Sequence, residues 1–350
     1  MLTANDSFVI DFDKHTLETR IRNFINSQGN NEYLKQAFDL SKIYAERAVY
    51  MQSKIKSLDH WEENIANFQY RIFDKRMLFY HSSAVWRVRD NVMKHMLKPN
   101  IALMSCRQVL QSGFQHAFVT DSIADDSSIS NKTRERTYIF PRFIYGSTDR
   151  QGNLFENSRD DIRHPNFTNE FIKYFYEQVH HPTTDIIAED IFHYIYAILY
   201  SNTYRQKYQE FLKIDFPRIP FTKDYKLFKK VAPLGRQLIE LHLLKGEASA
   251  NPDVKFPAPG DNRVKKREYK ESEDRIYVND TQYFERIKPD IWNYYIGGYQ
   301  VLDKWLKDRI GRTLSADDIK HYCKIATALA KTITIQKQID ELYPKVEETL

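Results

Sequence analysis

The densest run of cationic side chains in the sequence lies within residues 261–270, where five Lys or Arg residues stand against two carboxylates. On a strand, alternation would place Arg263, Lys265 and Arg267 on one face at a spacing of roughly 7 Å. Successive phosphates on one strand of DNA have a similar spacing, so this row would bind a phosphate backbone with affinity that depends on salt and not on base sequence. A solvated charged hairpin is the alternative, and the local sequence does not separate the two.

A second pattern with chemical meaning joins Asp253, which follows a proline, to Glu268 and Lys270. In nucleases with this pattern, two carboxylates on adjacent strands hold Mg²⁺, and the lysine polarises the scissile phosphate or the attacking water. Only four letters of the pattern are fixed, and residues 224–226 show how readily an acidic residue and a lysine fall two apart in so charged a chain. A Mg²⁺-dependent nuclease is therefore an alternative and not the first interpretation.

Other catalytic signatures are absent from the sequence. Glycine accounts for 10 of 350 residues, under half of the ~7% average, and neither G-x-G-x-x-G nor G-x-x-x-x-G-K-[ST] occurs, so loops that wrap nucleotide phosphates are not expected. The motifs H-E-x-x-H and G-x-S-x-G are missing too. So is the [N/D/S]-P-P-[Y/F/W] tetrapeptide, which holds an exocyclic amine during amino-methylation. We expect no catalytic residue and no metal site in this chain.

The composition limits which cellular compartment and which binding partners we expect for this chain. The net charge of +5 permits a polyanionic partner without requiring one. Two cysteines, Cys106 and Cys323, are too few for a disulfide framework or a zinc site. The first residues have no basic flank and no apolar core typical of a signal peptide, and no apolar run approaches the ~18 residues of a membrane span. We expect a cytoplasmic protein that makes no membrane contact.

The elements that would position these side chains alternate between strand-like and helical patterns. Residues 8–12 look like a short strand, and apolar residues between Ala37 and Met51 form one helical stripe. Residues 121–130, rich in Ser and Asp, predict an exposed loop. Further strand candidates lie at residues 101–106, 114–120, 137–145, 263–269 and 275–278.

Helical patterns dominate the middle and the end of the chain. Apolar stripes run over residues 187–198 and 227–241, and Pro233 is expected to open a fresh helix at its first turn. Ser315 and Asp318 form a capping-box pattern ahead of a long last helix, whose stripe covers residues 319–333. The fold class is therefore α+β: a mixed α/β chain with helices at both ends and in the middle, short antiparallel strands between them and a long C-terminal helix.

Four segments carry a resemblance to a known family. They are Y-R-I-F-D-K-R at residues 70–76, K-T-x-E-x-x-Y-I-F-P at 132–141, the stretch 192–220, and G-G-Y-Q-V-L-D-K-W-L-K-D-R at 297–309. In this order they resemble the C-terminal specificity region of type ISP restriction–modification enzymes. Ile72 departs from the family's usual proline. The motif positions that we note, most of them expected to be structural, are Arg71, Asp74, Arg76, Tyr204, Arg218, Gly298, Tyr299, Gln300, Lys304 and Trp305.

The resemblance implies a helical connector over residues 1–65 and, over residues 66–350, a target-recognition domain that grips double-stranded DNA. S-adenosylmethionine and the adenine-methylating centre would belong to a methyltransferase module or subunit outside this chain. The candidate DNA contacts are Arg263, Lys265, Lys266, Arg267, Lys132, Arg134 and Arg136. A third interpretation is a protein-interaction module that pairs through the stripe at 319–333. Because this stripe barely exceeds two heptads, packing onto its own domain is the preferred use.

Overall fold

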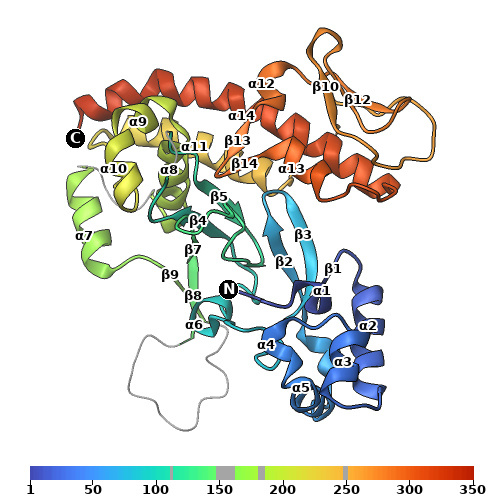
Figure 1. Ribbon diagram of the computed structural model, residues 1–350. Coiled ribbons are helices and arrows are strands. Elements are labelled where there is room, and N and C mark those ends of the chain that lie inside the picture. Colours follow the sequence, from blue (N-terminus) through green and yellow to red (C-terminus); the bar gives the residue numbers. More distant parts are fainter. Residues whose placement is uncertain (111–112, 147–161, 180–185, 247–250) are drawn as a thin grey trace. The chain divides into compact units, whose positions relative to one another are not determined.

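Short helices form the start of the chain in the computed structural model (Figure 1), and polar residues cap two of them. The Asp13 and Asn30 side chains each accept a first-turn backbone N–H, at the starts of α2 (Lys14–Asn26) and α3 (Asn31–Ala37). Such caps satisfy donors that have no partner within the helix. The neighbouring short helices are α1 (Asp6–Val9), α4 (Lys42–Ala45), α5 (Ala48–Lys56), η1 (Trp61–Asn64) and α6 (Asp90–Met93).

The structure describes residues 1–110, 113–146, 162–179, 186–246 and 251–350, apart from the side chain of Ile43. These residues form two compact units. The first comprises Met1–Ala102 and Thr120–Ser128, and the second comprises Leu103–Val119 and Ile129–Leu350. The boundary between a connector and a recognition domain at residues 65 and 66 lies inside the first unit. It does not coincide with the division into packed units, and it stays a prediction.

A four-stranded sheet in the order β1-β3-β2-β6 forms the centre of the first unit. β2 and β3 are joined by a two-residue turn in which Phe73 adopts a φ of 55°. β1 and β2 pair antiparallel with β3, whereas β6 lies parallel to β2. The strands are β1 (Ile10–Asp11), β2 (Ile65–Arg71), β3 (Asp74–Phe79) and β6 (Ile123–Ala124).

Two sequence expectations for this unit are wrong in detail. Residues 8–12 are not one strand, because α1 continues to Val9 and only Ile10–Asp11 pairs with β3. The stripe over residues 37–51 is not one helix but parts of α3, α4 and α5. The chain turns after α3, where Asp39 adopts a left-handed φ of 48°. This turn lets Phe38 pack edge-to-face on Phe24, with ring centroids 5.1 Å apart.

The composition of residues 121–130 predicts an exposed loop, and this prediction is wrong. They contain β6, and Ser122, Asp125, Ser128 and Ser130 are all buried. The Ser128 hydroxyl lies 2.7 Å from the carbonyl oxygen of Gln69 and 2.9 Å from that of Asp125. Small hydroxyl and carboxylate side chains can be buried when hydrogen bonds replace those to water. The composition of this segment therefore reflects internal hydrogen bonding.

The second unit contains several small sheets. One has the order β5-β4-β7, and another the order β10-β11-β12, in which both pairs are antiparallel. β8 pairs with β9, and β13 with β14. Their bounds are β4 (Ala102–Cys106), β5 (Ala117–Thr120), β7 (Thr137–Pro141), β8 (Phe143–Tyr145), β9 (Arg163–Pro165), β10 (Glu268–Lys270), β11 (Arg275–Tyr277), β12 (Tyr283–Glu285), β13 (Tyr295–Ile296) and β14 (Tyr299–Gln300).

Three long helices of this unit pack together: α8 (Ala188–Tyr200), α11 (Tyr225–His242) and α14 (Ala316–Glu348). Pro233 does not open a fresh helix, because it lies inside α11. A proline removes one helical hydrogen bond, and burial of apolar residues on both sides of it keeps this helix continuous. The other helices are α7 (Asn169–Gln178), α9 (Asn202–Lys207), α10 (Gln209–Ile214), η4 (Glu271–Glu273), α12 (Pro289–Trp292) and α13 (Val301–Lys307).

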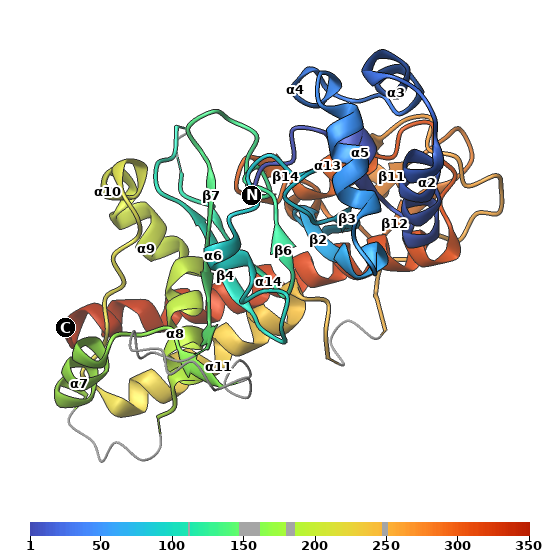
Figure 2. The ribbon, with the colours of Figure 1, turned by 90° about the horizontal axis from the view of Figure 1, so that it is seen from below.

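The long last helix, drawn in red in Figures 1 and 2, begins with the predicted capping box of Ser315 and Asp318. In its stripe, Tyr322, Ala326 and Leu329 are buried against the helix's own unit, which fills the surface that helix pairing would need. No helix among the described residues is long and apolar enough to cross a membrane. Helices and small, mostly antiparallel sheets in one chain confirm the α+β class.

Candidate nucleic-acid interface

A short loop after Ser130 presents three of the predicted cationic contacts. Arg134 and Arg136 are exposed and Lys132 is half-buried, whereas Glu135 between them is completely buried. Among the described residues, Lys132 and Arg134 form no ion pair. Because Glu135 points inward, its neighbours on both sides project outward. The loop therefore offers two cationic groups, on Lys132 and Arg134, that no carboxylate of the described residues neutralises.

Four hydrogen bonds fix Glu135 in the interior. Its Oε2 accepts from the Ser130 hydroxyl at 2.6 Å and contacts Nε2 of His116 at 3.1 Å, and its Oε1 accepts the Leu110 N–H at 2.8 Å. Its carbonyl oxygen accepts from Sγ of Cys106 at 3.4 Å. Burial by itself raises the pKa of Glu135, but the bonds from His116, Ser130 and Leu110 outweigh it and lower the pKa to about 2. The carboxylate is thus ionised at neutral pH.

Glu135 belongs to a motif segment, but sequence reasoning assigned it no role. The signal that would have found it is a single carboxylate between two arginines, with Ser130 five residues upstream. Its partners Leu110 and His116 come from a distant part of the chain. Only folding brings them together.

The second cationic cluster differs from its prediction. Only Glu268–Lys270 is a strand, while Arg263 makes an isolated bridge to Thr313. The N–H groups of Lys265 and Lys266 both donate to the carbonyl of Val278, at 2.7 and 3.0 Å. Two consecutive residues opposite one partner form a bulge, so the regular alternation ends here. The expected row of evenly spaced cations on one strand face is therefore wrong.

Most cations of this cluster already have carboxylate partners. Lys265 pairs with Asp261 at 3.3 Å. Lys266 lies 3.0 Å from Glu268 and 3.2 Å from Asp280, and Arg267 pairs with Asp303. Arg263 is exposed, and none of the described carboxylates forms an ion pair with it. Exposed pairs of this kind contribute little to stability, but a phosphate must displace the carboxylate before it can bind. Arg263 is thus the freest member of the cluster.

The nuclease alternative requires two carboxylates on adjacent strands, and the structure separates them. Glu268 lies in β10, at one edge of the sheet β10-β11-β12. Asp253 lies two residues before Lys255, which bridges to Glu285 of β12 at the opposite edge. Asp253 and Glu268 are therefore about three strand spacings apart, which amounts to roughly 14 Å. This distance is too long for both carboxylates to bind one Mg²⁺. In the described part of the chain, no group of three or more His, Cys, Asp or Glu residues is placed to hold a metal.

The motif residues of the β2–β3 hairpin contact one another. Arg71 pairs with Asp125 at 3.0 Å, and Arg76 pairs with Asp74 at 2.7 Å. The ring of Tyr70 lies against both guanidinium groups, at 3.8 Å from Arg71 and 3.7 Å from Arg76. Cation–π contacts and ion pairs thus engage each of these side chains. Their geometry is that of a structural cluster.

The G-G-Y-Q motif acts through close packing. A Cβ atom on Gly297 would lie 2.1 Å from the carbonyl oxygen of Ile129, and one on Gly298 would lie 2.5 Å from Oγ of Ser130. Gly297 also has a φ of 60°, which favours glycine. Both glycine N–H groups donate within the unit, to the carbonyls of Gln115 and Ile129. These glycines hold β13 and β14 against the residues that lead into the cationic loop.

The remaining motif residues are also engaged internally. Tyr299 is buried, and Gln300 donates to the carbonyl of Trp292 at 2.8 Å. Lys304 pairs with Asp308 one helical turn later. Trp305 is buried, with the guanidinium of Arg309 3.5 Å above its ring.

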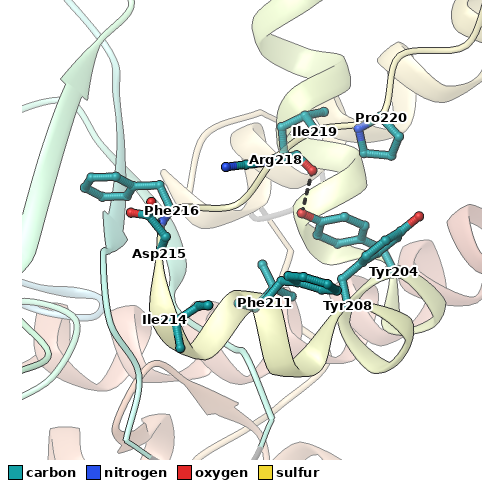
Figure 3. Close-up of a pocket in the computed structure, with 10 residues that line it drawn as sticks. Tyr204, Tyr208, Phe211, Ile214, Asp215, Phe216, Arg218, Ile219 and Pro220 are labelled. Atoms are coloured by element: carbon teal, nitrogen blue, oxygen red, sulfur yellow. Dashed lines mark hydrogen bonds between the residues drawn. The ribbon is translucent and has the colours of Figure 1, made fainter.

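An apolar pocket of about 610 Å³ lies beside α9 and α10. Figure 3 shows Tyr204, Tyr208 and Phe211 facing the extended segment that ends at Pro220, and the Tyr204 hydroxyl donates to the carbonyl of Arg218 at 2.9 Å. The motif residues Tyr204 and Arg218 therefore shape this pocket. It is separate in sequence from both cationic clusters.

The profile of the family called "Type ISP C-terminal specificity domain" matches residues 1–338. This chain belongs to that family. The match confirms the resemblance that the four motif segments predicted. No curated protein matches the specificity domain.

Solved structures share the fold of this specificity domain. A DrdV–DNA complex has a TM-score of 0.73 at 20% identity, over 96% of this chain and 35% of that one. A nuclease-deletion mutant of the Type ISP restriction–modification enzyme LlaGI, in complex with a DNA substrate mimic, gives 0.65 at 19% identity, over 97% and 32%. The ATP-dependent Type ISP enzyme LlaBIII bound to DNA gives 0.69 at 17%, over 97% and 22%. The specificity domain thus spans between about a fifth and about a third of these proteins.

Proposed function

We propose that this specificity domain binds double-stranded DNA and supplies target recognition to a restriction–modification enzyme. The observation that carries the proposal is the loop at residues 131–136, where Lys132 and Arg134 have no carboxylate partner among the described residues and the buried Glu135 orients the backbone. Cations on a preorganised loop bind phosphates without first breaking an ion pair. The DNA complexes of the three structural neighbours agree with this proposal.

In this proposal, Lys132, Arg134, Arg136 and Arg263 contact the phosphate backbone. The paired residues Lys265, Lys266 and Arg267 take a lesser part. Phosphate contacts fix the position of a protein on DNA, whereas base edges carry the sequence information. Base reading would need additional Arg, Lys, Asn or Gln side chains in a groove.

We further propose that methyl transfer takes place outside this chain, in a methyltransferase module or subunit. The sequence lacks an N-P-P-Y-like tetrapeptide, and its one Gly-Gly pair uses both N–H groups internally. S-adenosylmethionine thus finds no site of its usual kind here, and we derive no catalytic step for this chain. The connector at residues 1–65 would join the two parts.

Titration of duplex binding against salt tests the proposal. Fluorescence anisotropy of a labelled duplex should show log K falling linearly with log salt, with a slope of about −0.9 for each phosphate contact. A slope near zero would refute DNA binding.

Calorimetry with S-adenosylmethionine should show no heat of binding, and micromolar affinity would refute the assignment of methyl transfer to another module.

A further inference from the structure

The segment from Trp86 to Lys94 in the first unit exposes cations beside an exposed aromatic ring. We propose that this segment is a second contact surface for the phosphate backbone of duplex DNA, in addition to the loop at 131–136. The inference rests on the proposed function, since it takes duplex DNA as the partner. No motif position and no predicted contact falls in this segment.

Backbone hydrogen bonds hold the segment in place. Leu2 and Arg87 exchange two N–H to carbonyl bonds, of 3.0 and 3.1 Å. The Tyr80 hydroxyl donates to the carbonyl of Val88 at 2.9 Å. Val85, just before the segment, is buried, whereas the Trp86 side chain is 48% exposed. The indole therefore stands out from a backbone that is fixed on both sides of it.

The charges on this segment are predominantly positive. Arg87, Arg89 and Lys94 are exposed, and among the described residues none of them forms an ion pair. Asp90 is the one carboxylate in the segment, and Asp125 and Asp126 lie near the amino group of Met1, as Arg89 does. Asp125 pairs with Arg71, and the three cations outnumber Asp90 and Asp126. By contrast, three of the four cations at residues 263–267 are already paired.

The aromatic ring favours a nucleic acid over a simple anion. The guanidinium of Arg87 lies 4.7 Å from the Trp86 ring centroid, so the indole holds the arginine on the surface by a cation–π contact. A guanidinium presents paired donors to phosphate oxygens, and an indole offers an apolar face to the adjacent sugar. Large exposed aromatic residues next to arginine are typical of binding surfaces.

The salt dependence of duplex binding tests this surface with a triple variant of the full chain, Arg87→Gln, Arg89→Asn and Lys94→Gln. Asparagine is chosen because Arg89 has a left-handed φ of 55°, which asparagine tolerates. The magnitude of the salt slope should fall by about 1 for each lost phosphate contact, hence by 2 to 3 in total. An unchanged slope would overturn the inference.

The same unit offers a matched control. On α5, Tyr50 is 60% exposed and the Lys54 ammonium lies 5.5 Å from its ring. The double variant Tyr50→Ala and Lys54→Gln removes an exposed aromatic–cation pair elsewhere and should leave the slope unchanged. A loss of about 1 in this control, which is the same loss per removed charge as in the triple variant, would reduce the effect to bulk charge and overturn the assignment to Trp86–Lys94.

A second measurement uses the tryptophan itself. Binding of unlabelled duplex should change the tryptophan emission of the wild-type protein, and Trp86→Phe should abolish that change. Persistence of the whole change in the variant would count against the surface. Failure of the proposed function looks different, because the wild-type protein would then show no salt-dependent binding at all.

Discussion

His242 is buried between α8 and α14. Its Nδ1 lies 2.6 Å from the hydroxyl of Tyr196, and its Nε2 lies 3.0 Å from Oγ1 of Thr332. Thr332 donates its own proton to the carbonyl of Ala328, so it accepts from Nε2–H, and Nδ1 accepts from Tyr196. Burial lowers the pKa of His242 from its ordinary 6.5 to about 3, with Arg205 adding to the effect. The ring is therefore neutral at physiological pH.

Replacement of His242 should make the free energy of unfolding depend less on pH below neutrality. The unfolded chain binds a proton near pH 6.5 but the folded protein does not, so stability is complete above 6.5 and falls as the pH drops toward 3. When the pH is lowered from 7 to 5, the free energy of unfolding of His242→Gln should fall by about 2 kcal/mol less than that of the wild type. Urea unfolding at several pH values measures this, and parallel pH profiles would contradict it.

Glu135 is the buried carboxylate that holds the proposed contact loop in place. Its folded pKa of about 2 lies below the ordinary value of 4.5, so its contribution to stability is present above pH 4.5 and is lost as the pH falls toward 2. This window lies below the one used for His242, so the two residues can be separated. Protonation of Glu135 would weaken its bonds to Ser130 and Leu110, and with them the position of Arg134 and Arg136.

At the scale of elements, one glycine sets the distance between α8 and α11. A Cβ atom on Gly235 would lie 1.8 Å from the carbonyl oxygen of His193 and 3.0 Å from the N atom of Ala197. These neighbours are helix backbone and cannot move aside as a side chain can. The two helices approach closely only because α11 has no side chain at this position.

The variant Gly235→Ala should therefore destabilise the protein, although alanine is the better helix former by about 1 kcal/mol. Forced separation of the two helices should cost at least about 3 kcal/mol. Arg236→Ala is the control, because Arg236 is exposed and, in the part of the chain that the structure describes, its ion pair is with Glu240 one turn away. Thermal melts of both variants give the result; equal or higher stability of Gly235→Ala would show that the helices do not pack this closely.

At residues 263–267, the local backbone structure determines which carboxylates the cationic side chains pair with. Its composition predicts a cationic strand, but the bulge opposite Val278 turns Lys265 and Lys266 toward separate partners. The ion pairs join charges that are far apart in the chain, such as Arg267 and Asp303. Counting charges along the sequence thus overestimates how many are free.

At the scale of the whole molecule, DNA binding should depend on how many cations are without a carboxylate partner, and not on the total number of cations. The variant set Lys132→Gln, Arg134→Gln and Arg263→Gln removes three cations that form no ion pair with any residue the structure describes. It should lower the magnitude of the salt slope by 2 to 3, at about 1 for each contact. Anisotropy titrations in increasing NaCl supply the slopes.

The paired cations provide the comparison. The set Lys265→Gln, Lys266→Gln and Arg267→Gln removes the same charge, but each of its members has a carboxylate partner. Its slope should change by less than half as much. If both sets change the slope equally, net charge alone determines binding, and the assignment of the 131–136 loop fails.

The sequence by itself predicted the α+β class, the capping box at Ser315 and the family, because caps, periodicity and motif order are local properties of the chain. The sequence also pointed to the cationic residues at 132–136. It did not predict Glu135 as their support, because the partners Leu110 and His116 come from another segment. Burial of residues 121–130 and pairing of the cluster at 263–267 were decided by the tertiary structure alone. Hydrogen bonds and ion pairs depend on distance in space, and folding sets that distance.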